Sequence, residues 1–276
     1  MALTVNTNLA ANRAMTQLGK TSRELNGSFQ RISSGLRISK AADDAAGLGV
    51  AENLKVAYSS ARVAQRNVGD GVSMIAVAEG ATSEVASILG RMRELAVQSA
   101  SETLGDDERA YIQDEFVALS AEVDRIAGTT EFNGQALTDG TATTFGVQVG
   151  INNTANDQVD ITMGDLSAAT LGVDTAAVDM STSSGASSAL TSIDSAIEMV
   201  SGYRSDYGAA ENRLGSALNN LETYAENTAA AESAIRDADF GYESAELAKN
   251  QVLQQAGVAV LAQAKSMSQS VLSLIQ

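Results

Sequence analysis

The stretch from Val50 to Ala96 carries the longest regular pattern in the chain. Small or apolar residues recur along it in steps of four and three. This period is close to the roughly 3.5 residues at which helices wind around one another with one face toward the partner. Only Gly71 and Thr82 in this row are not plainly apolar. Because a second row widens the apolar face, the pattern predicts a long helix with more than one partner; that row comprises Met74, Ala81, Ile88 and Leu95.

Helical spacing also marks both ends of the chain. A four-three rhythm from Ala11 to Leu36 predicts a first long helix, followed by a bend in which Asp43 or Asp44 caps the central helix. A last helix is expected from about Glu243, with two apolar seams side by side. One seam can pair with the first helix, and the other requires a second copy of the protein. The seam residues of both ends are Leu18, Leu25, Phe29, Ile32, Leu253, Val258, Val260, Leu261, Met267, Val271, Leu272 and Leu274.

The middle of the chain departs from this pattern. A turn at residues 102–108 precedes another helix, whose apolar face ends near Gly128 and which should run antiparallel to the central one. Between about 130 and 165, turn signals and alternating apolar residues predict a small β-hairpin region with its loop at 152–157.

The residues from about 175 to 188 are rich in Ser and Thr. Their low complexity predicts a short surface link that buries no core. Helical spacing resumes at Leu190 and continues toward Asn227. The predicted fold class is therefore mainly α, with long coiled-coil-like helices packed as an elongated rod. We expect two domains: residues 1–42 and 236–276 as terminal helices, and residues 43–235 as the rod with its hairpin.

The composition supports long helices and narrows the functions. Proline, which ends or kinks helices, is absent from all 276 residues. The net charge of −16 repels nucleic acid and anionic lipid. We expect no nucleic-acid partner and no membrane insertion, because the apolar stretch from Ala256 to Ala262 is too short to span a bilayer. No N-terminal apolar run resembles a cleavable signal peptide.

The chain also lacks the residues of most catalytic and metal sites. It has no cysteine and no histidine, which removes disulfides, thiolate ligands and the imidazole base. The acidic clusters at 106–108 and at Asp237 with Asp239 lack the glycine and terminal glutamate of a calcium loop, so we interpret them as helix caps and solvated turns. We predict no catalytic residues, no metal site and no cofactor.

Six motifs resemble the bacterial flagellin family. They occur in the family's order, at both ends and in the middle: residues 2–9 (ALTVNTNL), 31–38 (RISSGLRI), 43–47 (DDAAG), 93–100 (RELAVQSA), 130–134 (TEFNG), and 251–264 with QVLQQAG and VLAQA. The chain resembles a short form of the family, because many members insert outer domains after the position of Leu171. The resemblance implies a structural subunit that self-assembles into the filament of the bacterial flagellum for swimming motility.

The resemblance also implies partners and a location. The partners would be other copies of the chain, an export chaperone, the flagellar export apparatus, and the filament cap and hook-junction proteins. The location would be the extracellular filament, reached without a cleaved signal peptide. The alternative function is a flagellin-like junction protein between hook and filament, and copy number in isolated flagella would separate the two.

Two surface sites complete the expectations. Arg91, Leu95 and Glu115 match the pattern through which some flagellins contact a receptor of animal innate immunity, and the same face would contact neighbouring subunits. The plainer interpretation of this charged face is a solvated, salt-bridged surface. The Ser/Thr-rich link offers hydroxyls for O-linked sugars at Ser181, Thr182, Ser183 and Ser184, and an unmodified flexible link explains it equally well.

Overall fold

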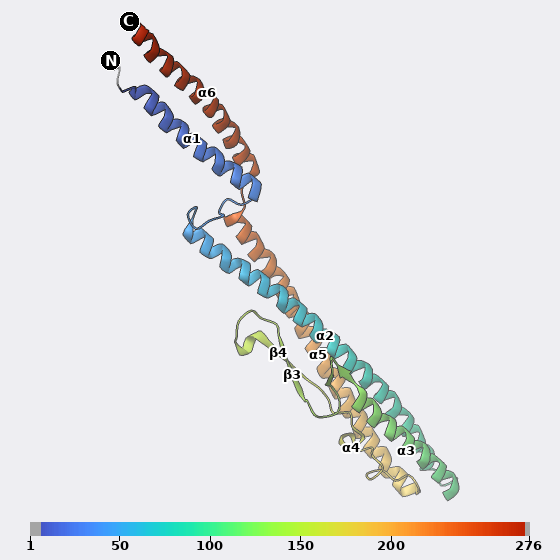
Figure 1. Ribbon diagram of the computed structural model, residues 1–276. Coiled ribbons are helices and arrows are strands. Elements are labelled where there is room, and N and C mark those ends of the chain that lie inside the picture. Colours follow the sequence, from blue (N-terminus) through green and yellow to red (C-terminus); the bar gives the residue numbers. More distant parts are fainter. Residues whose placement is uncertain (1–6, 274–276) are drawn as a thin grey trace. The chain divides into compact units, whose positions relative to one another are not determined.

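The structure is a computed structural model that describes the backbone of residues 7–273 and the side chains as far as residue 266. It consists of long helices with two small antiparallel strand pairs (Figure 1). The helices and strands are α1 (Leu9–Ser34), α2 (Ala45–Ser99), α3 (Asp106–Thr129), β1 (Glu131–Phe132), β2 (Gln135–Ala136), β3 (Thr144–Gln148), the 3-10 turn η1 (Ala155–Asp157), β4 (Gln158–Thr162), α4 (Ala168–Leu171), α5 (Ser183–Arg236) and α6 (Phe240–Ser273).

The chain divides into two compact units. Unit 1 comprises Met1–Ala57 and Glu226–Gln276, and unit 2 comprises Tyr58–Ala225. Both dividing points fall inside the long helices α2 and α5. The domain boundaries expected after residues 42 and 235 fall in the connector before α2 and at the last turn of α5, and that division stays a prediction. The boundary between two compact units can lie inside one continuous helix, and the residue pattern of that helix does not show where it lies.

The four-three row of α2 forms the spine of unit 2. Every member from Ala61 to Ala96 is buried, and so are Met74 and Leu95 of the second row. The two non-apolar members of the row have structural reasons. A Cβ on Gly71 would lie 3.1 Å from a methyl of Val147, so β3 packs against this glycine. The Thr82 hydroxyl is buried and donates to the backbone oxygen of Ala78 at 2.7 Å. The predicted central helix is confirmed.

By length and composition alone, α2 also contains a stretch apolar enough to cross a membrane. Of that stretch, 33 % is buried inside the protein. The buried apolar residues of α2 from Ala61 on belong to the two core clusters of unit 2, one shared with α3 and α5 and the other with α5 and the β3–β4 pair.

The helix α3 folds back along α2, and the hairpins follow it (Figure 1). Its buried face includes Ile112, Phe116 and Val123, as its spacing predicts. The turn between β1 and β2 has positive φ angles at both Asn133 and Gly134. These angles define the tight hairpin turn that the Asn-Gly pair favours. The strands β3 and β4 pair in register over five residues, with the predicted loop between them.

The segment expected to be a surface link proves to be part of the core. Val178, Met180 and Ala186 are each at most 2 % exposed, and α5 begins at Ser183 rather than at Leu190. The hydroxyl of Thr182 accepts from the Gly185 N–H at 3.0 Å and caps the new helix. The prediction was wrong because three small or apolar side chains spread among Ser and Thr leave no periodic signal, yet they fill gaps between α2, α3 and α5.

Unit 1 contains the antiparallel pair α1 and α6 together with the adjoining ends of α2 and α5. Asp44 accepts from the Gly47 N–H at 2.9 Å, so it caps α2 as expected. Val50, the first member of the α2 row, is 51 % exposed, so the buried seam of α2 does not extend to its start.

Candidate assembly surface

The connectors at the base of α1 and α6 hold the two helices together. Leu36 and Asp237 form an antiparallel bridge. The Arg37 N–H donates to the Arg236 oxygen at 2.7 Å, and the Ala238 N–H donates to the Gly35 oxygen at 2.9 Å. Gly35 has a φ of 71°, a left-handed conformation that glycine adopts without strain and that ends α1. The segments that precede α6 and follow α1 are therefore joined by backbone hydrogen bonds.

Three contacts define how α1 lies against α6. Near these segments, Arg31 Nε donates to Glu243 Oε1 at 2.7 Å. Midway, a Cβ on Gly257 would lie 3.2 Å from the Leu18 Cδ1 atom. At the far end, the Asn8 side chain donates to the Ala264 oxygen at 2.9 Å. The helices therefore run antiparallel in one register along the described length.

The facing rows of these helices mix leucine and isoleucine with small residues, and their most buried members are polar. Both follow four-three steps and hold the residues of lowest exposure in the pair, among them Thr21 at 3 %, Ser28 at 1 % and Asn250 at 3 %. The α1 row is Ala11, Ala14, Leu18, Thr21, Leu25, Ser28 and Ile32, and the α6 row is Glu243, Leu247, Asn250, Gln254, Gly257, Leu261 and Ala264.

Apolar side chains remain uncovered on either side of these rows. On α1, Phe29 is 65 % and Met15 is 56 % exposed. On α6, Leu253 is 45 %, Val258 is 53 % and Val260 is 60 % exposed. Large exposed apolar side chains that gather on one helix pair are typical of a protein–protein contact.

The predicted seam residues are thus split between two environments. Leu18, Leu25, Ile32 and Leu261 are partly buried between the helices. Phe29 and the three α6 residues Leu253, Val258 and Val260 are exposed. The side chains of Met267, Val271, Leu272 and Leu274 lie outside the described part of the structure. Spacing alone could not predict this split, because apolar residues surround most of α6 and no single side of it stands out.

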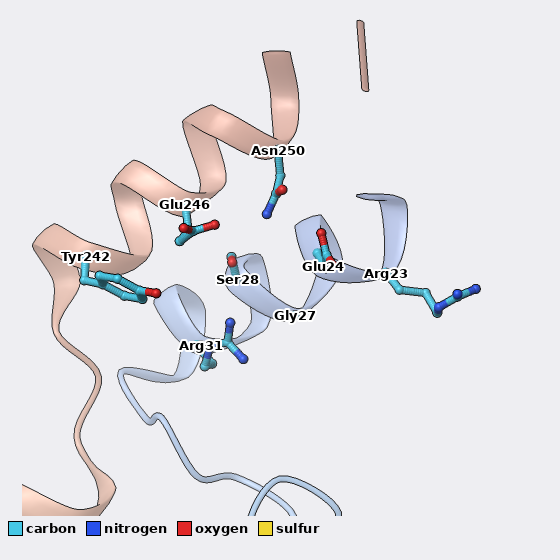
Figure 2. A pocket seen from close by; sticks show the side chains of 8 residues that line it. All are labelled: Arg23, Glu24, Gly27, Ser28, Arg31, Tyr242, Glu246 and Asn250. Carbon is cyan, nitrogen blue, oxygen red and sulfur yellow. The ribbon is translucent and has the colours of Figure 1, made fainter. Parts of the chain in front are cut away.

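A polar pocket opens beside the pair near its base (Figure 2). Its volume is about 350 Å³, and Ser28, Glu246 and Asn250 extend toward the space between the helices, whereas Arg23 points away from it. Glu243 lies on the same row with one carboxylate oxygen buried and unpaired. Near its base, the interior of this pair therefore contains buried polar groups that supply no hydrophobic stabilisation.

The surface expected around Arg91 is only partly as predicted. The Arg91 guanidinium donates to Glu115 at 2.8 Å and to Glu94 at 3.0 Å, and these hydrogen bonds raise the pKa of Arg91. Leu95, however, is only 2 % exposed and belongs to the core between α2 and α3. It cannot share an exposed face with the other two residues, because its own helix row turns it inward.

The Ser/Thr cluster proposed for glycosylation lies at the start of α5. The Thr182 hydroxyl is engaged in the helix cap, and the Ser183 hydroxyl donates to the Ala100 oxygen at 2.9 Å. Ser181 is partly buried and Ser184 is exposed. Modification at these sites stays a prediction.

The acidic clusters occupy helix starts. Asp106, Asp107 and Glu108 form the first turn of α3. Asp239 accepts from the N–H groups of Gly241 and Tyr242, at 2.9 and 3.1 Å, and so begins α6. Within residues 7–273, no cluster of acidic side chains is grouped closely enough to hold a metal ion.

Comparison with known proteins agrees with this architecture. Residues 5–143 match the family model of the bacterial flagellin N-terminal helical region, and residues 190–275 match that of the C-terminal helical region. The chain is 43 % identical over 272 residues to a flagellin of Halalkalibacterium halodurans, covering 99 % of both. It is 38 % identical over 284 residues to the flagellar filament 30.7 kDa core protein of Treponema maltophilum, covering 98 % of this chain and 99 % of that one.

The fold has a counterpart among solved structures. The crystal structure of Bacillus cereus flagellin superposes with a TM-score of 0.50 at 32 % identity, covering 60 % of this chain and 94 % of that one. The regions matched by the two family models include both terminal helices and the central helix. The Halalkalibacterium flagellin aligns with this chain over 99 % of both lengths, so neither has an inserted outer domain relative to the other. The chain therefore belongs to the bacterial flagellin family, as a short form without a variable domain.

Proposed function

We infer that the exposed apolar side chains of α1 and α6 are the contacts through which copies of this chain polymerise. Membership in the family makes the chain a structural subunit of the flagellar filament. Which residues join the subunits is our proposal. The observation that carries it is the set of large apolar side chains that the helix pair leaves exposed, namely Met15, Phe29, Leu253, Val258 and Val260.

The energetics favour this assignment. Burying one leucine or valine side chain contributes about 1.5–3 kcal/mol. Covering these five exposed side chains by a neighbouring copy would therefore stabilise the contact substantially. Neighbouring copies are the occupants that fit, because a helical polymer presents the same two helices from several subunits to one another. The rows of Leu253, Val260 and Phe29 would then be inaccessible in the filament.

The test places a charge on that surface. V260D and L253D should leave the circular dichroism of the monomer largely unchanged, because Val260 is 60 % and Leu253 is 45 % exposed. Polymer yield by sedimentation and electron microscopy should fall at least about tenfold, since burying an unpaired carboxylate costs several kcal/mol. Q255D, on an exposed polar position of the same helix outside the heptad rows of Leu253, Val258 and Val260, is the matched control and should polymerise normally. Long filaments from V260D would refute the assignment.

The alternative, a junction protein between hook and filament, predicts a different stoichiometry. Counting copies in isolated flagella separates the two, because a filament needs thousands of subunits and a junction needs about one ring. The name of the Treponema relative, a filament core protein, favours the filament.

Further partners are proposed on the same basis. Before export, the uncovered face of α6 would suit an export chaperone. The flagellar export apparatus, the filament cap and the hook-junction proteins would meet the chain on its way to the extracellular filament, without cleavage of a signal peptide. We also propose that the chain has no enzymatic activity, since the family is structural and the sequence holds neither histidine nor cysteine.

Contact with an innate immune receptor is proposed only for Arg91 and Glu115, whose side chains are 50 % and 45 % exposed. Reversing both charges, as R91E with E115R, should reduce receptor signalling by monomeric protein while keeping the ion pair. Unchanged signalling in a reporter-cell assay would exclude this contact.

A further inference from the structure

The methionine side chains differ sharply in their exposure. They carry all the sulfur of the chain, because cysteine is absent. Met199 is partly buried against the core of unit 2. Met15 on α1, in contrast, is 56 % exposed. The remaining methionines with described side chains are core residues, at most 7 % exposed: Met74, Met92, Met163 and Met180.

Met15 borders the packed seam of the terminal helix pair. Leu18, three residues further along α1, lies against Gly257 of α6. Phe29 follows Met15 by 14 residues, which is two heptads, so the two side chains share one stripe of α1. Phe29 is 65 % exposed. Met15 is therefore part of the apolar surface proposed for assembly, and more than half of its own surface is open to solvent.

A thioether that is open to solvent reacts with hydroperoxides. A lone pair of the sulfur attacks one peroxide oxygen, so that an S–O bond forms while the O–O bond breaks. With hydrogen peroxide the departing oxygen takes up a proton and leaves as water, and the sulfur becomes a sulfoxide. The peroxide must reach the sulfur, so the core methionines are shielded. Met15 should therefore react first.

The sulfoxide changes what this position can contact. It replaces a flexible apolar thioether by a polar group that accepts hydrogen bonds. In the free subunit the new oxygen is hydrated, because Met15 is exposed. Under a neighbouring copy it would lose that water without gaining a donor, which is unfavourable. Oxidation of Met15 therefore acts against assembly rather than against folding.

We propose that Met15 is an oxidation site for hydroperoxides in the unassembled subunit, and that its sulfoxide keeps the subunit out of the polymer. The site of reaction follows from exposure alone. In its consequence for assembly this inference rests on the proposed function. Once a neighbouring copy covers Met15, peroxide no longer reaches the sulfur, so assembled subunits are protected.

Peptide mapping by mass spectrometry locates the added oxygen after treatment with hydrogen peroxide. The protein carries M267L, because the side chain of Met267 lies outside the described part of the structure. In soluble monomer, Met15 should be oxidised at least about tenfold faster than each of the four core methionines. In sedimented filaments its rate should fall at least about tenfold, since the same surface is covered.

Polymer yield then measures the consequence. Peroxide-treated monomer should give at least about fivefold less polymer than untreated monomer. Methionine sulfoxide reductases for both epimers, supplied with a dithiol that is oxidised as the oxygen leaves as water, should restore the yield. M15L keeps an apolar side chain without sulfur and should polymerise equally well before and after peroxide. M15Q should polymerise poorly without any peroxide, whereas T16Q, at the exposed position beside it, should polymerise normally.

The outcomes separate this proposal from the assembly function. Equal oxidation rates at Met15 and the core methionines overturn the oxidation site. Selective oxidation of Met15 with an unchanged polymer yield, or a loss of yield that persists in M15L, overturns its effect on assembly. V260D tests the assembly surface without touching Met15. Filaments from V260D therefore refute that surface, while the oxidation site still stands or falls by the peptide map.

Discussion

The phenol oxygen of Tyr207 accepts a hydrogen bond from the backbone N–H of Gly164 at 3.0 Å. Tyr207 lies on α5 and is 1 % exposed, among the largest fully buried side chains of the chain. Gly164 follows β4 by two residues. One hydroxyl thus fastens the β3–β4 pair to the helical core of unit 2, and burial raises the pKa of this phenol.

Y207F should destabilise the protein by about 1–3 kcal/mol, because the buried N–H of Gly164 loses its acceptor while the aromatic packing is kept. Urea unfolding followed by circular dichroism measures the change. Y111F, on a side chain that is 74 % exposed, is the control and should have no effect. The raised pKa means that the neutral phenol is favoured in the folded state, so the contribution of Tyr207 holds below its ordinary pKa of 10 and is lost at higher pH.

Two glycines of α2 should respond to alanine in opposite directions. A Cβ on Gly71 would approach Val147 at 3.1 Å and Leu214 at 3.4 Å, whereas one on Gly69 would meet nothing within 4 Å. G69A should stabilise the protein by about 0.5–1 kcal/mol through helix propensity. The free energy of unfolding of G71A should be about 1–3 kcal/mol lower than that of G69A, because the added methyl group overpacks the contact with β3. Equal midpoints for the two variants in thermal unfolding would show that the hairpin adapts without cost.

Arg109 of α3 is a buried cation that binds the backbone carbonyls at the C-terminal end of α2. Its guanidinium donates to the Ser99 oxygen at 3.0 Å and to the Ser101 oxygen at 2.9 Å, and its residue exposure is 7 %. R109M should lower the free energy of unfolding by about 2–4 kcal/mol, since both carbonyls lose their donor. R109K should restore only part of this stability, because an ammonium group cannot reproduce the planar fork of the guanidinium. R125M, at a side chain 59 % exposed, is the control.

Asp165 should make the stability of the protein decrease at low pH. Burial opposes its ionised form, but hydrogen bonds from the Thr170 hydroxyl and the Ser167 N–H, at 2.6 and 2.9 Å, prevail and lower the pKa of Asp165 below 3.8. Its contribution is therefore present above that ordinary value and is lost as pH falls through the lower folded value. D165N should unfold at a lower temperature than the parent at neutral pH, and this difference should narrow as the pH falls below 3.8. A constant gap would show that ionisation is irrelevant here.

The terminal helices should gain protection only on assembly. Their most buried facing residues are polar and several large apolar side chains stay exposed, so pairing alone offsets little of the roughly 1–2 kcal/mol per residue that ordering costs. Limited proteolysis of monomer should trim both ends to a resistant core near residues 45–235, and filaments should resist cleavage at the same sites. Equal protection of the ends in monomer and filament would contradict the coupling.

Local patterns in the sequence determined much of unit 2. The row from Ala61 to Ala96 predicts its own burial, because heptad spacing is a property of one helix regardless of its partner. The Asn133-Gly134 turn and the β3–β4 pair are likewise decided by neighbouring residues, since glycine and asparagine tolerate positive φ. The family motifs carried the function in the same way, through residues adjacent in the chain.

Only the tertiary structure decided which face meets which neighbour. Apolar residues surround most of α6, so spacing could not choose the row of Asn250 as the one that meets α1. The burial of Met180, the carbonyls held by Arg109 and the inward position of Leu95 depend on segments far apart in sequence. Periodicity reports that a face is covered, but the covering partner is set by packing among several helices at once, and that information lies in no single stretch of the chain.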